Sequence, residues 1–355
     1  MRALLVGSTG GLLLLLLLCC GTTPVPAADG ADRLEEILSV MRDRQEQVRT
    51  FVAEWIEAPG ADDGRQRERT IRLTVGSEGQ FLLESSPTGE RTAGQAGAMK
   101  SSFDGRRNRQ FTEAVGKDDW PRGIVWDDAK YDELSGAQIR IWLLHLRPFF
   151  QPLPDLGNGQ LRITEQDVLL DGHRCIVVEK PGHDSDSYVE RYWIDIDRAC
   201  ILRSEQRSKE GGRLLFERTA RYRQDDGLGW LPESWESRFG NGSNALRARL
   251  VRFERNRELP GDTFAFEFPV GTVVFDRDRG LRHLVLADGK TRDITPEESA
   301  SGFDYRALRE MSPSELAPRF DARQEEWTPS TIVLLAANVL VLVAGATFWC
   351  LRRGE

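Results

Sequence analysis

Side chains that commonly carry out chemistry are sparse in this chain of 355 residues. The four histidines stand at positions 145, 173, 183 and 283, and no two of them have the spacing that places two metal ligands on one helix face. The chain has no G-x-S-x-G, H-E-x-x-H, C-x-x-C or Walker motif. His173 and Cys175 share one face of a predicted strand, but no third ligand lies nearby in the sequence. We therefore expect no catalytic residue, no metal site and no cofactor, in a protein that is not an enzyme.

Three polar clusters contain residue types that act together in known sites. Residues 183–187 read His-Asp-Ser-Asp-Ser, but neighbours in one loop cannot converge as a catalytic triad requires. Such clusters ordinarily form hairpin loops. Asp195 and Asp197 follow a predicted strand, and residues 241–243 (Asn-Gly-Ser) match a glycosylation acceptor between glycines. We interpret all three clusters as turns.

A stronger signal is the aromatic and aliphatic content of one face of the predicted strands. Phe51 and Trp55 share a face, because residues i, i+2 and i+4 of a strand point the same way. Two interpretations stay open: an ordinary core packed against helices, or a cavity that binds an acyl chain or another lipid. The residues that would line such a cavity are Phe51, Trp55, Leu73, Phe81, Leu83, Leu214, Phe216, Tyr222 and Trp235.

The hydrophobic period indicates which elements position these residues. Apolar side chains at i, i+3, i+4 and i+7 predict a helix from Asp32 to about Gln47 and a second helix over residues 135–146, which ends before Pro148. The rest of the chain alternates with period 2 between Gly-, Asp- and Ser-rich turns, which predicts antiparallel neighbours. A sheet of about ten such strands must curl or close.

The fold class expected is mainly β (α+β), a curved, unclosed antiparallel β-barrel of about ten strands wrapped around helices. Beyond Phe275 the alternation weakens to one or two strands, of which 281–286 is the best defined, and a helix near 305–311. The strands predicted in the second half of the domain span residues 160–166, 168–179, 188–196, 200–207, 213–222, 230–239 and 246–255.

The first residues have the pattern of a secretory signal. A positive charge at Arg2 precedes an unbroken leucine run over residues 12–18, and Ala27 offers a small residue for cleavage. We expect a signal peptide over residues 1–27. Lipid attachment at Cys19 or Cys20 is the alternative, although the residue before each of them is not the small one that such a signal prefers.

The last residues have the pattern of a membrane anchor. Residues 331–351 carry no charge, and about 20 apolar residues suffice to cross a bilayer. Arg352 and Arg353 follow at once, which predicts a cytoplasmic tail at 352–355 and an extracytoplasmic (periplasmic) domain. The order of Pro329-Ser330-Thr331, an apolar stretch and two arginines also resembles a C-terminal sorting tag that is removed after export, and this alternative stays open. The domain itself would span 28–276, with an extension and stalk at 277–330.

Charge and cysteine content narrow the function further. The net charge of −8 argues against nucleic acid as a partner. The folded domain holds only Cys175 and Cys200, which an exported compartment would allow to form a disulfide. Sequence alone does not show whether their Cα atoms come within bonding range.

Several short motifs, in order, resemble the LolA/LolB superfamily of periplasmic lipoprotein carriers, of which this chain would be a divergent, membrane-anchored member. Residues 33–55 look like the family's opening helix running into the first strand. The remaining motifs are Ser102-Phe103-Asp104-Gly105-Arg106, Asp171-Gly172-His173-Arg174-Cys175 with Tyr192-Trp193-Ile194-Asp195, Gly229-Trp230-Leu231-Pro232-Glu233, and the closing residues Phe253, Asn256, Pro260, Phe264, Phe268, Pro269, Gly271 and Thr272.

The resemblance implies a non-enzymatic protein of the bacterial cell envelope that binds a lipid or an acylated lipoprotein on a hydrophobic concave sheet face. The predicted anchor departs from the family, because a soluble carrier must shuttle. A tethered relative could receive or hand over lipid at one membrane. The alternative is a sensory or scaffold ectodomain whose partner is an envelope protein.

Overall fold

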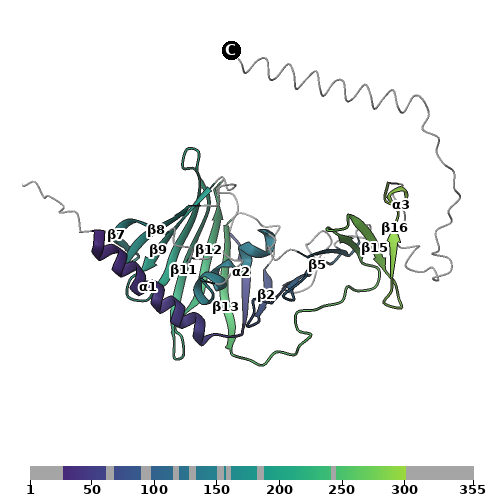
Figure 1. The fold of residues 1–355 in the computed structure, drawn as a ribbon, viewed down its shortest axis with the longest axis horizontal. Coiled ribbons are helices and arrows are strands. Elements are labelled where there is room, and N and C mark those ends of the chain that lie inside the picture. Colours follow the sequence, from purple (N-terminus) through teal and green to yellow (C-terminus); the bar gives the residue numbers. More distant parts are fainter. Residues whose placement is uncertain are drawn as a thin grey trace, which may run out of the picture. The chain divides into compact units, whose positions relative to one another are not determined.

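A computed structural model describes residues 27–60, 68–88, 97–114, 120–127, 133–149, 156, 161–181, 188–240 and 245–300 of the chain. Sixteen strands in this part form one sheet, which three helices accompany (Figure 1). None of the described helices is long and apolar enough to span a membrane. The predicted signal sequence up to residue 26, the predicted span at 331–351 and the predicted helix near 305–311 lie outside the described residues.

The first six strands form an antiparallel meander in which each strand pairs with the next. Its turns follow the sequence signals: Gly79 and Gly105 adopt φ of 82° and 96°, a region that glycine enters without steric cost. In the hairpin that contains Gly105, the Asp104 carboxylate accepts the backbone N–H groups of Arg106 and Arg107. The strands are β1 (Phe51–Pro59), β2 (Arg69–Val75), β3 (Phe81–Pro87), β4 (Met99–Phe103), β5 (Asn108–Thr112) and β6 (Arg122–Trp126).

A second antiparallel meander follows α2. The predicted strand at 168–179 is wrong, because a hairpin turn interrupts it: Asp171 and Gly172 adopt φ of 50° and 85°, and Leu170 pairs with His173. An Asp-Gly pair favours this two-residue turn. The seven strands are β7 (Arg162–Leu170), β8 (His173–Pro181), β9 (Tyr188–Asp195), β10 (Cys200–Ser208), β11 (Leu214–Asp225), β12 (Gly229–Phe239) and β13 (Ala245–Arg255).

The two meanders join where the first and last of these strands meet. β1 pairs with β13 from Phe51 opposite Arg255 to Pro59 opposite Leu246. The expected number of about ten strands is too low, because the described part of the chain contains sixteen in one sheet. The sheet is not closed, as expected: β7 forms one edge and β16 the other.

The sheet continues beyond residue 272 through three short strands. The strands β14 (Val273–Asp276), β15 (Leu281–Val285) and β16 (Thr291–Ile294) precede a one-turn helix α3 (Pro296–Ala300). β14 pairs in parallel with β6, and Val273 lies opposite Arg122. The strand predicted at 281–286 is confirmed as β15. The period-2 pattern does not predict β6, β14 and β16, which have only five, four and four residues, although it predicts β15, which also has five.

Two helices lie against one face of the sheet. They are α1 (Ala27–Gln47) and α2 (Glu133–Leu146), each extending slightly beyond the predicted start (Figure 1). In α2 the predicted apolar face is buried, with Ile139 and Trp142 fully enclosed. Trp142 of this helix contacts rings from β1, β12 and β13, and the helix also lies against β10. Helix α1 lies against β7, and its apolar residues share a buried cluster with residues of β8, β9 and β10. We call the helix-covered side of the sheet its concave face.

Candidate functional site

The concave face brings most of the predicted cavity residues together. Six of them belong to one buried cluster: Phe51, Trp55, Leu73, Phe81, Leu83 and Trp235. Leu214 and Phe216 are half-buried and lie at the start of β11. Tyr222 contacts a different cluster, which contains Cys175 and Cys200. The alternation rule therefore grouped the residues of β1 to β3 correctly. The Tyr222 ring also lies 5.1 Å from the ring of His145 of α2, beyond a register shift at which β12 carries one extra residue.

The centre of this cluster is a side chain from α2. The ring of Trp142 lies 6.0 Å from that of Trp55, 5.9 Å from that of Trp235 and 5.8 Å from that of Phe253. Phe51 adds a fifth ring at 6.3 Å from Trp142. We call these five residues the aromatic floor. The sequence predicts Trp142 as part of the packing face of the helix, and in the structure its ring lies among the four other rings of the floor.

Two polar atoms of the aromatic floor are buried without a hydrogen-bond partner in the structure. They are the indole Nε1 atoms of Trp55 and Trp142, and both side chains are fully enclosed. A buried donor that lacks an acceptor costs about 1–3 kcal/mol, so such groups are rare in native proteins. The packing of α2 on the floor is therefore apolar and tight, but it leaves two donors that an incoming acceptor could satisfy.

A row of charged side chains crosses the concave face beside the aromatic floor. Glu57 lies two residues beyond Trp55 on the same face of β1, directly opposite Arg69 of β2. Arg140 of α2 donates to the Glu190 carboxylate, and to the Tyr192 hydroxyl at 3.1 Å. We call the set of five, Glu57, Arg69, Arg140, Glu190 and Arg218, the interior charged row.

The environment perturbs the pKa values along this row. Burial raises the pKa of Glu57, an effect that the nearby charges of Arg218 and Arg69 partly oppose. Burial, together with repulsion from Arg140, lowers the pKa of Arg218 to about 9. Burial alone would lower the pKa of Arg140, but the charges of Glu190 and Tyr192 and the hydrogen bonds to both together outweigh it, so the net direction is upward. The row is therefore a strongly coupled group of charges inside the domain.

The alternation of β1 and β11 could have revealed this row. Glu57 continues the series Phe51, Ala53 and Trp55, and Arg218 lies two residues from Phe216. A search for aromatic and aliphatic residues alone passes over charged residues at inward positions.

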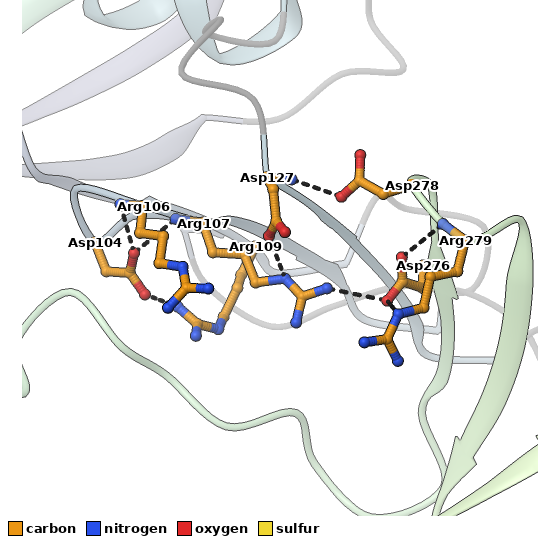
Figure 2. Close-up of a pocket in the computed structure, with 8 residues that line it drawn as sticks. All are labelled: Asp104, Arg106, Arg107, Arg109, Asp127, Asp276, Asp278 and Arg279. Carbon is orange, nitrogen blue, oxygen red and sulfur yellow. Dashed lines mark hydrogen bonds and ion pairs between the residues drawn. The ribbon is translucent and has the colours of Figure 1, made fainter.

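A separate charged pocket of about 420 Å³ lies beside the β4–β5 hairpin (Figure 2). Arg107 bridges Asp127 and Asp276, at 3.0 Å to each, and the backbone N–H of Asp127 donates to Asp278 at 2.7 Å. These pairs link the hairpin to the turn after β14. The lining residues are Asp104, Arg106, Arg107, Arg109, Asp127, Asp276, Asp278 and Arg279, four of each charge sign. The arrangement is that of a structural clamp, and it contains none of the aromatic floor.

The two cysteines are buried free thiols in the structure. Cys175 of β8 and Cys200 of β10 each pair with Asp195 of β9 and therefore flank it. Two strand spacings of ~4.8 Å exceed the Cα separation that a disulfide allows. Burial raises the pKa of Cys175 to about 11 and that of Cys200 to about 12, which keeps both thiols protonated and unreactive.

Of the three predicted turns, the one at Asp195 lies among the described residues. The Asp195 carboxylate accepts the backbone N–H groups of Asp197 and Arg198, which confirms the turn. In the described part of the chain, no group of three or more His, Cys, Asp or Glu residues could hold a metal ion. Residues 183–187 and 241–243 lie outside the described residues.

Comparisons with known proteins give a fold likeness at low identity. No family model and no curated protein matches the chain. A LolA superfamily protein from Nitrosomonas europaea is 15% identical with a TM-score of 0.45, covering 66% of this chain and 99% of that one. A putative outer membrane lipoprotein-sorting protein domain from Vibrio parahaemolyticus is 14% identical with a TM-score of 0.43, covering 65% and 97%.

A DUF1329 family protein from Desulfovibrio piger is similar at 13% identity and a TM-score of 0.45, covering 67% of this chain and 97% of that one. All three TM-scores are below 0.5, so what the protein does has to be inferred from its own residues.

Proposed function

We propose that this protein is a non-enzymatic, membrane-tethered lipid- or lipoprotein-binding protein of the cell envelope, and that its ligand binds on the concave face. The observation that carries the proposal is the aromatic floor, where Trp55 and Trp142 bury indole N–H groups without an acceptor. A core selected only for stability gains nothing from two orphaned donors. On a surface that is covered by a helix in one state and by a ligand in the other, such donors can form hydrogen bonds to the ligand.

In this proposal α2 occupies the ligand position in the unliganded state. When Trp142 leaves, an acyl chain packs on the four remaining rings of the floor. The Trp55 N–H then donates to the ester or amide carbonyl at the head of that chain, which recovers the cost of its burial. Aromatic rings with a polar handle suit this contact, because one end of each ring is apolar and the other donates.

The location of the protein is part of the same proposal. Two sequence patterns support a domain outside the cytoplasm, beside the membrane that holds it: the signal pattern over residues 1–27, and the charge-free stretch 331–351 followed by two arginines. From that position it would receive or hand over lipid at one membrane.

Native mass spectrometry tests this function on the full chain, extracted from its own membrane in nanodiscs. Acyl-bearing species should remain bound to the protein and should disappear in Trp55→Asp, which places a charge on the floor. The matched variant is Trp193→Asp, in the separate Cys175 cluster. If the wild type carries no acyl species but a stoichiometric protein, the carrier function is wrong and the sensory alternative is favoured.

A further inference from the structure

We propose that a pocket on the convex face of the sheet, the side opposite the concave face, binds a phosphate group between Arg221 and Arg249. The inference goes beyond the proposed function, because it concerns the other side of the sheet and does not depend on the aromatic floor. The ligand is a tetrahedral oxyanion whose acceptor oxygens face in several directions: the phosphate of a lipid headgroup or a free phosphate.

The register of three neighbouring strands places the two arginines on either side of one serine. Arg221 of β11 lies opposite Ser234 of β12, and Ser234 lies opposite Arg249 of β13. Trp235 belongs to the aromatic floor, so Ser234, its neighbour in the strand, points to the convex face. Neighbouring strands are ~4.8 Å apart, which puts the Cα atoms of the two arginines roughly 10 Å apart. Because arginine side chains are long, both guanidinium groups can reach a group held above the Ser234 hydroxyl.

The surface above this serine is hollow. A pocket of about 280 Å³ lies there, on β11, β12 and β13. The hydroxyls of Ser234 and Thr219 form no hydrogen bond with the described residues, so both are available to donate to a ligand. The lining residues of the pocket are Thr219, Arg221, Ser234, Trp235, Glu236 and Arg247.

The two arginines have no partner within the described residues. Arg221 and Arg249 are exposed, and neither forms an ion pair, a hydrogen bond or an aromatic contact there. The carboxylate in the pocket does not neutralise them, because Glu236 lies 2.8 Å from Arg238 and 3.5 Å from Arg247. The hydrogen bond from Arg238 is the main reason why the pKa of Glu236 is lowered. The pocket therefore has an excess of positive charge.

Two further carboxylates lie near the pocket and do not remove this excess. Glu217 of β11 is paired with Arg203 at 2.8 Å. Glu233 is the extra residue of β12 at the register shift, is exposed and forms no ion pair with the described residues. With these included, five guanidinium groups face three carboxylates in this neighbourhood: Arg203, Arg221, Arg238, Arg247 and Arg249 against Glu217, Glu233 and Glu236.

Another row on the same face has a carboxylate at the position equivalent to Ser234. Glu54 of β1 lies opposite Arg252 of β13 and opposite Arg72 of β2. Opposite charges on neighbouring strands stabilise a sheet. In the row of Arg221, Ser234 and Arg249 the chain supplies no acid at the centre, and the small serine leaves room for an anion from outside.

The donors of the pocket suit a phosphate. Guanidinium groups bind phosphate oxygens with two parallel hydrogen bonds. A phosphate group offers three acceptor oxygens, whereas a carboxylate offers two, so a phosphate can meet two guanidinium groups on opposite sides and a hydroxyl below. The charged pocket of Figure 2 is different, because four aspartates share its lining with the four arginines.

Protection of arginines from phenylglyoxal tests the inference on the full chain in phosphatidylcholine nanodiscs, with inorganic phosphate as the probe and tandem mass spectrometry to assign each modified residue. Phosphate at ten times its dissociation constant should slow the modification of Arg221 and Arg249 about tenfold, compared with sodium chloride of the same ionic strength. Arg72, an exposed arginine of the same face, is the control and should react equally in both salts. Arg218, which is 6% exposed, should stay unmodified throughout, which reports that the domain is folded.

Two variants and a second nanodisc composition complete the test. Ser234→Asp places a carboxylate at the centre of the row and should abolish the protection, whereas Ser234→Thr keeps the hydroxyl and should retain it. Protection in phosphatidylglycerol nanodiscs without added phosphate assigns the site to a lipid headgroup, and protection by inorganic phosphate alone assigns it to a free phosphate. Equal protection by chloride, equal protection of Arg72, full protection in Ser234→Asp, or no protection under any condition overturns the site.

Discussion

Arg44 of α1 donates from its guanidinium to Nδ1 of His145 in α2, across 3.2 Å in the protein interior. The other ring nitrogen, Nε2, donates to the backbone carbonyl of Trp230 at 2.8 Å. Arg44 also donates to the carbonyl oxygens of Arg198 and Ala199, at 3.0 Å and 3.1 Å. The two helices and the turn after β9 are thus joined through one arginine, and the histidine is satisfied in its neutral form.

The first prediction concerns the pH dependence of stability. Burial, and then the charge of Arg44, lowers the pKa of His145 well below its usual value of 6.5. Below about pH 6.5 His145 is protonated in the unfolded chain but stays neutral in the folded protein. The free energy of unfolding therefore falls as pH decreases, by up to about 1.4 kcal/mol per pH unit. Urea unfolding at a series of pH values should show this slope in the wild type and a shallower one in His145→Gln. Identical slopes would contradict it.

The second prediction separates stability from ligand binding at the aromatic floor. Trp142→Ala should reduce the free energy of unfolding by about 3–5 kcal/mol, because it leaves a large cavity. It should nevertheless increase binding of a fluorescent acyl probe, since the space on the floor is vacated. Trp193→Ala, in the Cys175 cluster, should cost a similar amount without increasing binding. Weaker probe binding in Trp142→Ala would show that α2 supports the ligand instead of replacing it.

The third prediction concerns the attachment of β14 to the sheet. Asp276 accepts from Arg107 at 3.0 Å and from the backbone N–H of Arg279 at 3.1 Å. Burial opposes its charge, but these contacts prevail and lower the pKa of the carboxyl. Asp276→Asn removes the charge, so hydrogen exchange should become faster in 273–285 and remain unchanged in β1 and β13. Glu233→Gln, an exposed carboxylate on β12, is the control. A uniform change across the sheet would argue against a local clamp.

The fourth prediction concerns the thiols. With pKa values of about 11 and 12, Cys175 and Cys200 should resist iodoacetamide in the native protein at pH 8 and react fully in urea. Peptide mapping distinguishes them from the other three cysteines of the chain. Recovery of a peptide that links residues 175 and 200 after non-reducing digestion would show that the two strands approach more closely than their register indicates.

Alternation in the sequence predicts most of the long strands, but at β7 and β8 the Asp171-Gly172 turn falls inside a continuous alternating run and the predicted boundary is wrong. The helix 135–146, the strands from Tyr188 to Arg255 and the passage from the first helix into β1 were predicted with small boundary errors. What sequence could not show was the pairing of β1 with β13, because nothing local in either strand specifies a partner that far away in the chain. The difference between a cavity and a filled core was equally hidden, since it depends on where Trp142 of α2 packs.

The charged residues of the concave face illustrate a second limit. Glu57 and Arg218 occupy inward positions by simple alternation, yet composition alone places charges on the solvent side. Only the packed sheet shows that they face Arg69, Ser237 and the helix. An inward-pointing charge in an otherwise apolar strand face is therefore worth noting at the sequence level.

The position of β1 determines when the sheet can assemble. The hairpins from β2 to β6 and from β7 to β12 form between neighbours in the chain, but Pro59 meets its partner Leu246 only after roughly 190 further residues have been made. Until then one edge of β1 has no strand beside it, and unpaired edges favour wrong association between chains. An incomplete chain that stops before residue 245 would expose this edge, the edge of the strand that carries Phe51 and Trp55. That is the place where unfinished chains would pair with one another.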